Sequence, residues 1–226
     1  MAERTIVAIG GWEWDDKTCV RRLQDYLLER ARGAKVCYVP TAAAERADAV
    51  VNFYEQWRGR GELSHLSFFP WPPADLREFA VGQDVLVVSG GNTANMLAIW
   101  RVHGFDEVLR EAWEAGVVLT GWSAGMICWF EAGVTDSFGP ELDGMRDGLG
   151  FLSGSACPHY DTEERRRPVY QRLVEGGFPP GYAADDCVAL RFAGTELAEV
   201  VSAREGATAY RVEPGREQRL EPRSLP

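Results

Sequence analysis

Two periodicities alternate along the first two thirds of the chain. Apolar runs at Thr5–Ile9, Lys35–Val39 and residues 84–88 are typical of strands buried on both faces of a parallel sheet. Between these runs, apolar residues recur every three or four positions, which is typical of helices with one buried face. Strands that alternate with helices predict an α/β fold, in which helices cover both faces of a mostly parallel sheet.

The elements that this pattern predicts cover most of the chain. We predict helices over residues 16–31, 42–58, 95–100, 105–115 and 163–175, and further strands over residues 63–69, 117–120, 182–192, 197–201 and 208–212. Residues 133–158 are rich in glycine and predict short strands and loops. Because no repeat or linker divides the chain, we predict a single domain over residues 1–226, with a loosely ordered tail from about Pro214.

Composition narrows the class of protein. With 226 residues, of which 46% are hydrophobic and 26% charged, the chain is long enough to bury a sizeable core. Its net charge of −10 argues against non-specific binding to nucleic acid, which requires a basic face. No apolar run approaches the ~18 residues of a membrane span, and we expect no leader sequence before the first predicted strand. We therefore expect a cytoplasmic protein that binds neither nucleic acid nor membranes.

The cysteines give no indication of a stabilising framework. They are odd in number, widely spread and without C-x-x-C spacing: Cys19, Cys37, Cys128, Cys157 and Cys187. This distribution predicts neither a set of disulfides nor a zinc site. We expect mostly buried free thiols.

The strongest chemical signal is a serine between two glycines. A short apolar strand runs directly into Gly121-Trp122-Ser123-Ala124-Gly125. Gly-x-Ser-x-Gly between a strand and a helix is the sequence form of a nucleophile elbow, which holds the serine on a strained turn with its hydroxyl exposed. The glycines permit close packing of the neighbouring elements, and the N–H of Ala124 can stabilise an oxyanion. The alternative is a serine in an ordinary strand–helix turn.

A serine nucleophile needs a base, and the chain has three histidines. His65 falls inside a predicted strand and His103 in a turn between helices, so we expect both to be structural. His159 follows the glycine-rich stretch in a loop, where catalytic residues are common. We predict that His159 is the base; the alternative is a structural or exposed histidine.

The base in turn needs an orienting carboxylate. Asp185 and Asp186 precede the apolar residues of a late strand, where two carboxylates are costly unless they are solvated or used. Asp161, two residues after His159, is a rival. The order serine, histidine, acid differs from that of the α/β-hydrolases, so we expect another parallel-sheet fold with the same catalytic roles.

A second glycine motif ends another predicted strand. In Ser89-Gly90-Gly91-Asn92, the glycines let backbone N–H groups approach a ligand. The motif matches neither G-x-G-x-x-G nor a P-loop, so nucleotide binding is not indicated. The pair Gly10-Gly11 is similar but less specific, and predicts at least a tight strand–helix turn.

Together, these motifs resemble the peptidase E family of α-aspartyl dipeptidases, whose relatives include cyanophycinase. The resemblance spans about residues 5–202 and implies a three-layer α/β sandwich with a flavodoxin-like core, like class I glutamine amidotransferases but with serine in place of their usual cysteine. It implies a catalytic triad and an oxyanion hole made of Ser123, His159 and Asp186 and of the N–H groups of Gly91 and Ala124. The family often has Glu at the acid position, where this chain has Asp.

The resemblance also implies a substrate. The family cleaves an N-terminal aspartate from dipeptides, and a cation should pair with that carboxylate. Arg166 matches the family's specificity arginine best, followed by Arg167, and Asn92 matches a position near the substrate. The alternative is a solvated basic stretch that pairs with Glu163 and Glu164.

We therefore predict a serine dipeptidase that acts on small peptides through an acyl-enzyme and needs no metal or organic cofactor, with a homodimer as the candidate assembly. One alternative is another serine hydrolase on the same scaffold: a cyanophycinase-like enzyme, an amidase or an esterase. A second alternative is a non-catalytic protein that binds a small molecule through a decayed triad. The presence of both Ser123 and His159 counts against decay.

Overall fold

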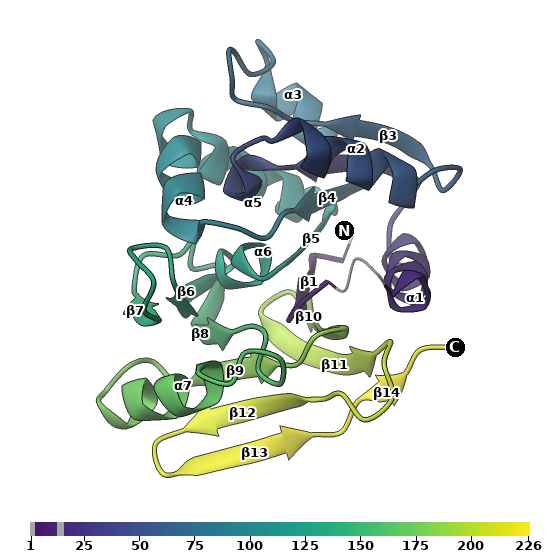
Figure 1. The fold of residues 1–226 in the computed structure, drawn as a ribbon. Coiled ribbons are helices and arrows are strands. Elements are labelled where there is room, and N and C mark those ends of the chain that lie inside the picture. Colours follow the sequence, from purple (N-terminus) through teal and green to yellow (C-terminus); the bar gives the residue numbers. More distant parts are fainter. Residues whose placement is uncertain (1–2, 13–15) are drawn as a thin grey trace.

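Eight strands form the main sheet of the computed structural model, which describes residues 3–12 and 16–226. From edge to edge, they are β14 (Arg223–Ser224), β11 (Glu196–Ser202), β10 (Val188–Ala193), β1 (Thr5–Ile9), β5 (Val118–Trp122), β4 (Val85–Val88), β2 (Lys35–Val39) and β3 (Glu62–His65). The strands from β1 to β3 are parallel, whereas β10 runs antiparallel to β1 (Figure 1). The predicted mostly parallel sheet is confirmed.

Helices cover both faces of this sheet. Val7 and Ile9 of β1 share one buried cluster with two helices, α1 (Lys17–Leu28) and α2 (Ala47–Gln56). Ile6 and Ala8 share another cluster with the helices of the opposite face, which are α3 (Leu76–Val81), α4 (Thr93–Val102), α5 (Phe105–Glu114) and α6 (Ala124–Ile127). Successive side chains of a strand point to opposite faces, so a strand buried on both faces is apolar throughout. The α/β sandwich with three layers is confirmed.

A second sheet packs beside the helices that cover the Ile6 and Ala8 face of the main sheet. Its six strands are β13 (Arg216–Leu220), β12 (Ala209–Glu213), β9 (Gly181–Ala184), β8 (Leu152–Cys157), β6 (Phe130–Thr135) and β7 (Asp143–Met145). Phe130 and Ala156 reach the core of the main sheet, and helix α7 (Arg166–Glu175) packs on the other face through Tyr170 and Val174. Figure 1 shows the β12–β13 hairpin at the outer edge of this sheet.

The chain after Pro214 is ordered, which corrects the expectation of a loose tail. Gly215 has a φ of 68° and turns the chain into β13, which pairs with β12 over five residues. Glu217 then accepts a hydrogen bond from Tyr160 at 2.7 Å. The polar sequence of β13 resembles a tail because that edge strand is held by backbone pairing and polar contacts, not by an apolar face.

The strand predicted over residues 182–192 is two strands in different sheets. β9 belongs to the second sheet and β10 to the main sheet, and Asp185, Asp186 and Cys187 connect them. Cys187 has a φ of 66°, which breaks the extended conformation. The acidic pair therefore lies where the chain passes from one sheet to the other.

The helix predicted over residues 42–58 is interrupted. A 3₁₀ turn, η1 (Thr41–Ala43), precedes α2, and Ala44 and Glu45 between them have positive φ angles. The carboxylate of Glu45 accepts the N–H groups of Phe68 and Phe69. This contact ties the turn to the loop after β3, which accounts for a break that helical periodicity does not reveal.

A disulfide joins Cys19 to Cys187, whereas the distribution of the cysteines predicts no set of disulfides and mostly free thiols. Cys37, Cys128 and Cys157 are free and buried, as expected. The bonded pair is separated by 168 positions, and α1 brings Cys19 to the residue that follows Asp186. No spacing rule could have revealed this pairing.

Among the described residues, no helix is both long and apolar enough to cross a membrane.

Candidate active site

Ser123 occupies a sharp turn between β5 and α6. Its φ of 56° and ψ of −112° are strained for a residue with a side chain, and such strain is concentrated at functional sites. A Cβ atom on Gly121 or Gly125 would lie 2.5 Å from the carbonyl oxygen of Val88 in β4, so both positions require glycine. The elbow geometry predicted from the sequence is present, and Ser123 is partly exposed.

His159 follows β8 and pairs with a carboxylate. Its Nδ1 atom lies 2.7 Å from Oδ1 of Asp186. His65 instead contacts the hydroxyl of Tyr54 at the surface. His103, at the end of α4, packs against the ring of Phe68. Among the described residues, His159 is therefore the one of the three histidines that pairs with an acidic side chain.

The three candidate carboxylates have separate environments. Asp186 contacts His159, whereas Asp185 accepts a hydrogen bond from the N–H of Thr208 at 2.9 Å. Asp161 accepts the N–H of Asp186 at 3.0 Å and forms an ion pair with Arg204. Asp186 is thus the acid in contact with the histidine, while Asp185 and Asp161 hold the backbone around it.

The two neighbouring aspartates differ in their electrostatics. Burial would raise the pKa of Asp186, but hydrogen bonds from His159 and Thr162 and the charge of His159 hold it below its usual range. Burial raises the pKa of Asp185 to about 6, and the hydrogen bond from Thr208 offsets only part of that effect. Asp186 is therefore the one of the pair that is held as a carboxylate.

The carboxyl end of β1 connects the serine to the His–Asp pair. The carbonyl of Ile9 accepts the N–H of Ser123 at 3.3 Å, and that of Gly11 accepts the N–H of Cys187 at 3.0 Å. Gly11 also forms a parallel bridge with Asp186. Ser123 therefore contacts Ile9 and Asp186 contacts Gly11, two positions further along the same end of β1. The hydroxyl of Ser123 forms no hydrogen bond with the described residues, so its contact with His159 stays a prediction.

Gly90 and Gly91 line the serine's other side. A Cβ on Gly90 would lie 3.2 Å from the Cβ of Ser123. Gly91 has a φ of 133°, and a Cβ there would overlap the carbonyl of Ala42. Ala124 begins α6, so its N–H has no acceptor within the helix. Gly90 thus lies against Ser123, and the role of the Gly91 and Ala124 N–H groups as an oxyanion hole stays a prediction.

Asn92 has a structural role in this arrangement. Its side-chain oxygen accepts the N–H of Asn95 at 2.8 Å, which caps α4. Its amide nitrogen donates to the carbonyl of Ser137 at 3.0 Å. Because both polar atoms of the side chain bind the protein, these contacts favour a role in shaping the Gly90–Gly91 turn over direct contact with substrate.

The two candidate specificity arginines also have protein partners. Arg166 is buried, with Nε 2.7 Å from the carboxylate of Glu163 and Nη1 2.8 Å from the carbonyl of Val134. Arg167 forms an ion pair with Glu217 and lies over the rings of Tyr160 and Tyr210. The placement of Arg167 against the second sheet argues against its predicted role as a substrate ligand.

Gly11 and Thr162 are two site residues that sequence reasoning did not single out for these roles. A Cβ on Gly11 would overlap the carboxylate of Asp186 and lie 2.8 Å from Nδ1 of His159. Thr162 donates its hydroxyl proton to Oδ2 of Asp186 at 2.9 Å. The pairing of Gly11 with Gly10 at a strand end indicates a close approach there, whereas a threonine in a loop has no such indication in the sequence.

The described residues hold no cluster of three or more potential metal ligands.

We expect Gly11→Ala to lower kcat/KM for peptide hydrolysis by about 10²-fold or more, because a displacement of about 1 Å in a catalytic group has that effect. The new methyl group would push Asp186 and His159 apart. Steady-state kinetics on the purified variant measures the effect. Gly139→Ala is the matched control, since a Cβ there meets no atom within 4 Å. Normal activity of Gly11→Ala would contradict the assigned roles of His159 and Asp186.

We expect Thr162→Val to lower kcat/KM by about tenfold, the effect of one hydrogen bond to a charged group. Without this donor, the pKa of Asp186 rises, so the loss should grow as the pH falls. Thr162→Ser keeps the hydroxyl and should retain most activity. A pH profile of all three proteins tests this prediction, and parallel profiles for wild type and Thr162→Val would refute it.

Comparison with known proteins identifies the family of this chain. The model of the family described as "Peptidase family S51" matches residues 6–200. The chain is 45% identical over 213 residues to "Uncharacterized peptidase YgaJ" of Bacillus subtilis (strain 168), covering 92% of each protein.

Solved structures share the fold. One is a peptidase from an acI-B1 Actinobacterium, with a TM-score of 0.70, 18% identity, and coverage of 97% of this chain and 95% of that one. Another is named "Putative Peptidase E Protein", from Listeria monocytogenes EGD-e, with a TM-score of 0.64, 18% identity, and coverage of 97% and 100%. The family match over most of the chain and the extent of the Bacillus similarity agree, and the chain belongs to peptidase family S51.

Proposed function

We propose that this peptidase is a serine enzyme that hydrolyses dipeptides with an N-terminal aspartate through an acyl-enzyme. The observation that carries the serine mechanism is the position of Ser123. It lies on a strained turn near the carboxyl end of β1. His159 and Asp186 are held near the same strand end, with Nδ1 of His159 2.7 Å from Oδ1 of Asp186. These are the groups that nucleophilic catalysis by a serine requires.

The reaction proceeds in two steps. Nε2 of His159 takes the hydroxyl proton of Ser123 as the serine oxygen attacks the peptide carbonyl, while Asp186 holds Nδ1–H. The N–H groups of Gly91 and Ala124 stabilise the oxyanion. His159 then gives the proton to the leaving amine, and the peptide bond breaks. Water, deprotonated by His159, hydrolyses the resulting ester and frees the serine.

Arg166 is the cation that we propose for the aspartate side chain. Its Nη2 has no hydrogen bond to the described residues, so it retains donors for a carboxylate. Arg166 is bonded to Val134, and Ser137, three residues further along, contacts Asn92 beside the serine. A buried substrate carboxylate without a paired cation would be costly by several kcal/mol.

A comparison of substrates and two arginine variants tests the proposal. Wild type should hydrolyse Asp-Leu faster than Glu-Leu, Leu-Asp, Ala-Leu or a simple ester. Arg166→Met should lower the Asp-Leu rate by about 10²-fold or more and leave the Ala-Leu rate level. Arg167→Met is the matched control and should keep the preference for Asp, because its guanidinium is paired with Glu217.

A second candidate function is another serine hydrolase on this scaffold, such as an amidase, an esterase or a cyanophycinase-like enzyme. The observation that favours it is the pairing of Arg166 with Glu163, which already neutralises the cation. If wild type shows no preference for Asp, this second candidate replaces the dipeptidase. If Ser123→Ala leaves hydrolysis unchanged, the serine mechanism fails for both candidates.

A further inference from the structure

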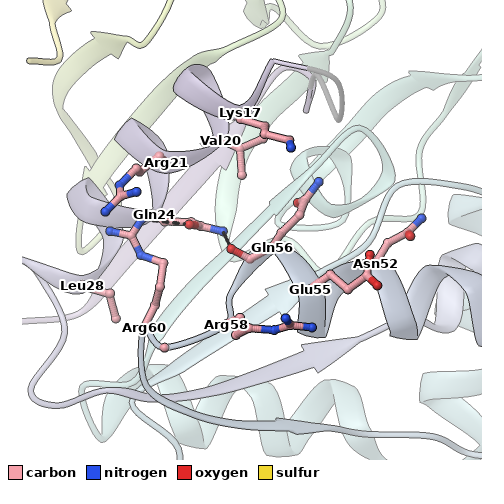
Figure 2. Close-up of a pocket in the computed structure, with 11 residues that line it drawn as sticks. Lys17, Val20, Arg21, Gln24, Leu28, Asn52, Glu55, Gln56, Arg58 and Arg60 are labelled. Carbon is pink, nitrogen blue, oxygen red and sulfur yellow. Dashed lines mark hydrogen bonds between the residues drawn. The ribbon is translucent and has the colours of Figure 1, made fainter.

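A basic groove lies between α1 and α2, on the helical layer that packs against Val7 and Ile9. It encloses about 720 Å³, within the range of small-molecule sites. Figure 2 shows Lys17 and Arg21 on α1 and Arg58 on the turn after α2, while Arg60, from the same turn, reaches across to Gln24 of α1. The described lining of the groove thus has four cations and the carboxylate of Glu55, and Asp25 beside it pairs with Arg60, in a protein whose net charge is −10.

These cations are unusual for this protein because most of its arginine side chains have partners. In the described part of the chain, the exceptions without a hydrogen bond, ion pair or ring contact are Arg21, Arg58 and Arg172. Two of these three line the groove, and Lys17 beside them is exposed and also without a partner among the described residues. Within the described part of the chain, the groove thus gathers three cations, Lys17, Arg21 and Arg58, that no acidic side chain neutralises.

The floor of the groove is polar and fixed. Gln24 is fully buried; it donates to the carbonyl of Gln56 at 3.2 Å and accepts from Nη1 of Arg60 at 3.0 Å. Arg60 is also paired with Asp25. Because Arg60 is held in place before any ligand arrives, binding would cost less side-chain entropy there than at a free surface arginine.

We propose that this groove binds a compact anion with at least two negative charges, of the polycarboxylate or oligophosphate class. Arginine guanidinium groups form paired hydrogen bonds with the oxygens of both anions, and a lysine adds a point charge. Unpaired cations around a concave site attract such ligands over several ångströms, and this attraction weakens with salt. Ser123 does not line the groove, and the proposal does not depend on the proposed peptidase specificity.

Calorimetric titration of the full chain with citrate and with tripolyphosphate tests the proposal. We expect at least one of the two anions to bind at a single saturable site. The anion that binds more tightly shows whether the groove prefers carboxylate or phosphate groups. The double variant Arg21→Gln/Arg58→Gln should weaken binding by about tenfold or more. The charge reversal Arg21→Glu/Arg58→Glu should abolish it. Raising the ionic strength should weaken wild-type binding.

Arg172→Gln is the matched control. Arg172 is also exposed and without a partner in the described chain, but its surroundings on α7, β12 and β13 include Glu175, Glu213 and Glu217. We expect this variant to bind as wild type does. Thermal unfolding without ligand checks that the variants fold. The proposal is overturned if neither anion binds at one saturable site, or if Arg172→Gln weakens binding as much as the groove variants do.

Discussion

Ser123→Ala is expected to lower peptide hydrolysis by about 10⁴-fold or more, because loss of a nucleophile removes the covalent step. The fold should survive. The Ser123 hydroxyl forms no hydrogen bond with the described residues, and alanine meets the same backbone strain at a φ of 56°. Steady-state hydrolysis of Asp-Leu and thermal unfolding measure both parts of the prediction.

Ser153→Ala provides the control for this experiment. Ser153 is an exposed residue of β8, so its loss should change neither rate nor stability. Turnover by Ser123→Ala close to that of wild type would exclude the serine mechanism. A large fall in its unfolding temperature would instead show that the elbow requires the hydroxyl for folding.

Asp186→Asn is expected to lower kcat by about 10³- to 10⁴-fold, the size of effect seen when a triad acid is replaced by an amide. The asparagine keeps the shape of the side chain but no longer stabilises the imidazolium that forms in the reaction. It also favours the wrong tautomer of His159, because an amide N–H replaces the oxygen now 2.7 Å from Nδ1. Kinetics at several pH values would show a loss that alkaline pH does not restore.

Asp185→Asn is the matched control, since the amide oxygen can still accept the N–H of Thr208. We expect near-normal activity but an altered dependence of stability on pH. The pKa of Asp185 is raised from 3.8 to about 6 in the folded protein, so the folded state binds this proton more tightly than the unfolded chain does. This group therefore destabilises the fold as the pH rises from about 4 to about 6, and Asp185→Asn should remove that component. Equal losses of activity in both variants would mean that the acid lies elsewhere.

Local features of the site could be predicted because they arise from residues close together in the chain. Thr5–Ile9 and Lys35–Val39 form strands at their predicted bounds, since their apolar runs permit little else in a buried layer. The glycines around Ser123 indicate a turn that only small residues permit. His159 was distinguished from the other histidines by its place in a loop.

Contacts between distant segments could not be predicted. Gly11 meets Asp186, and Cys19 bonds to Cys187, because the connection between β9 and β10 lies against the end of β1 and the start of α1. The donation from Thr162 to Asp186 depends on the same packing. None of these pairs has a characteristic spacing, since the intervening chain could have any length without changing the contact.

The choice among the acidic residues shows the difference most clearly. The sequence offers Asp161, Asp185 and Asp186 as partners of the base; the family resemblance implies Asp186, but the residues by themselves do not distinguish the three. The tertiary structure does, because the break at Cys187 turns Asp186 toward His159 while Thr208 holds Asp185 and Arg204 holds Asp161. Periodicity and turn residues act over a few positions and therefore determine elements, whereas the orientation of a carboxylate depends on the packing of two sheets.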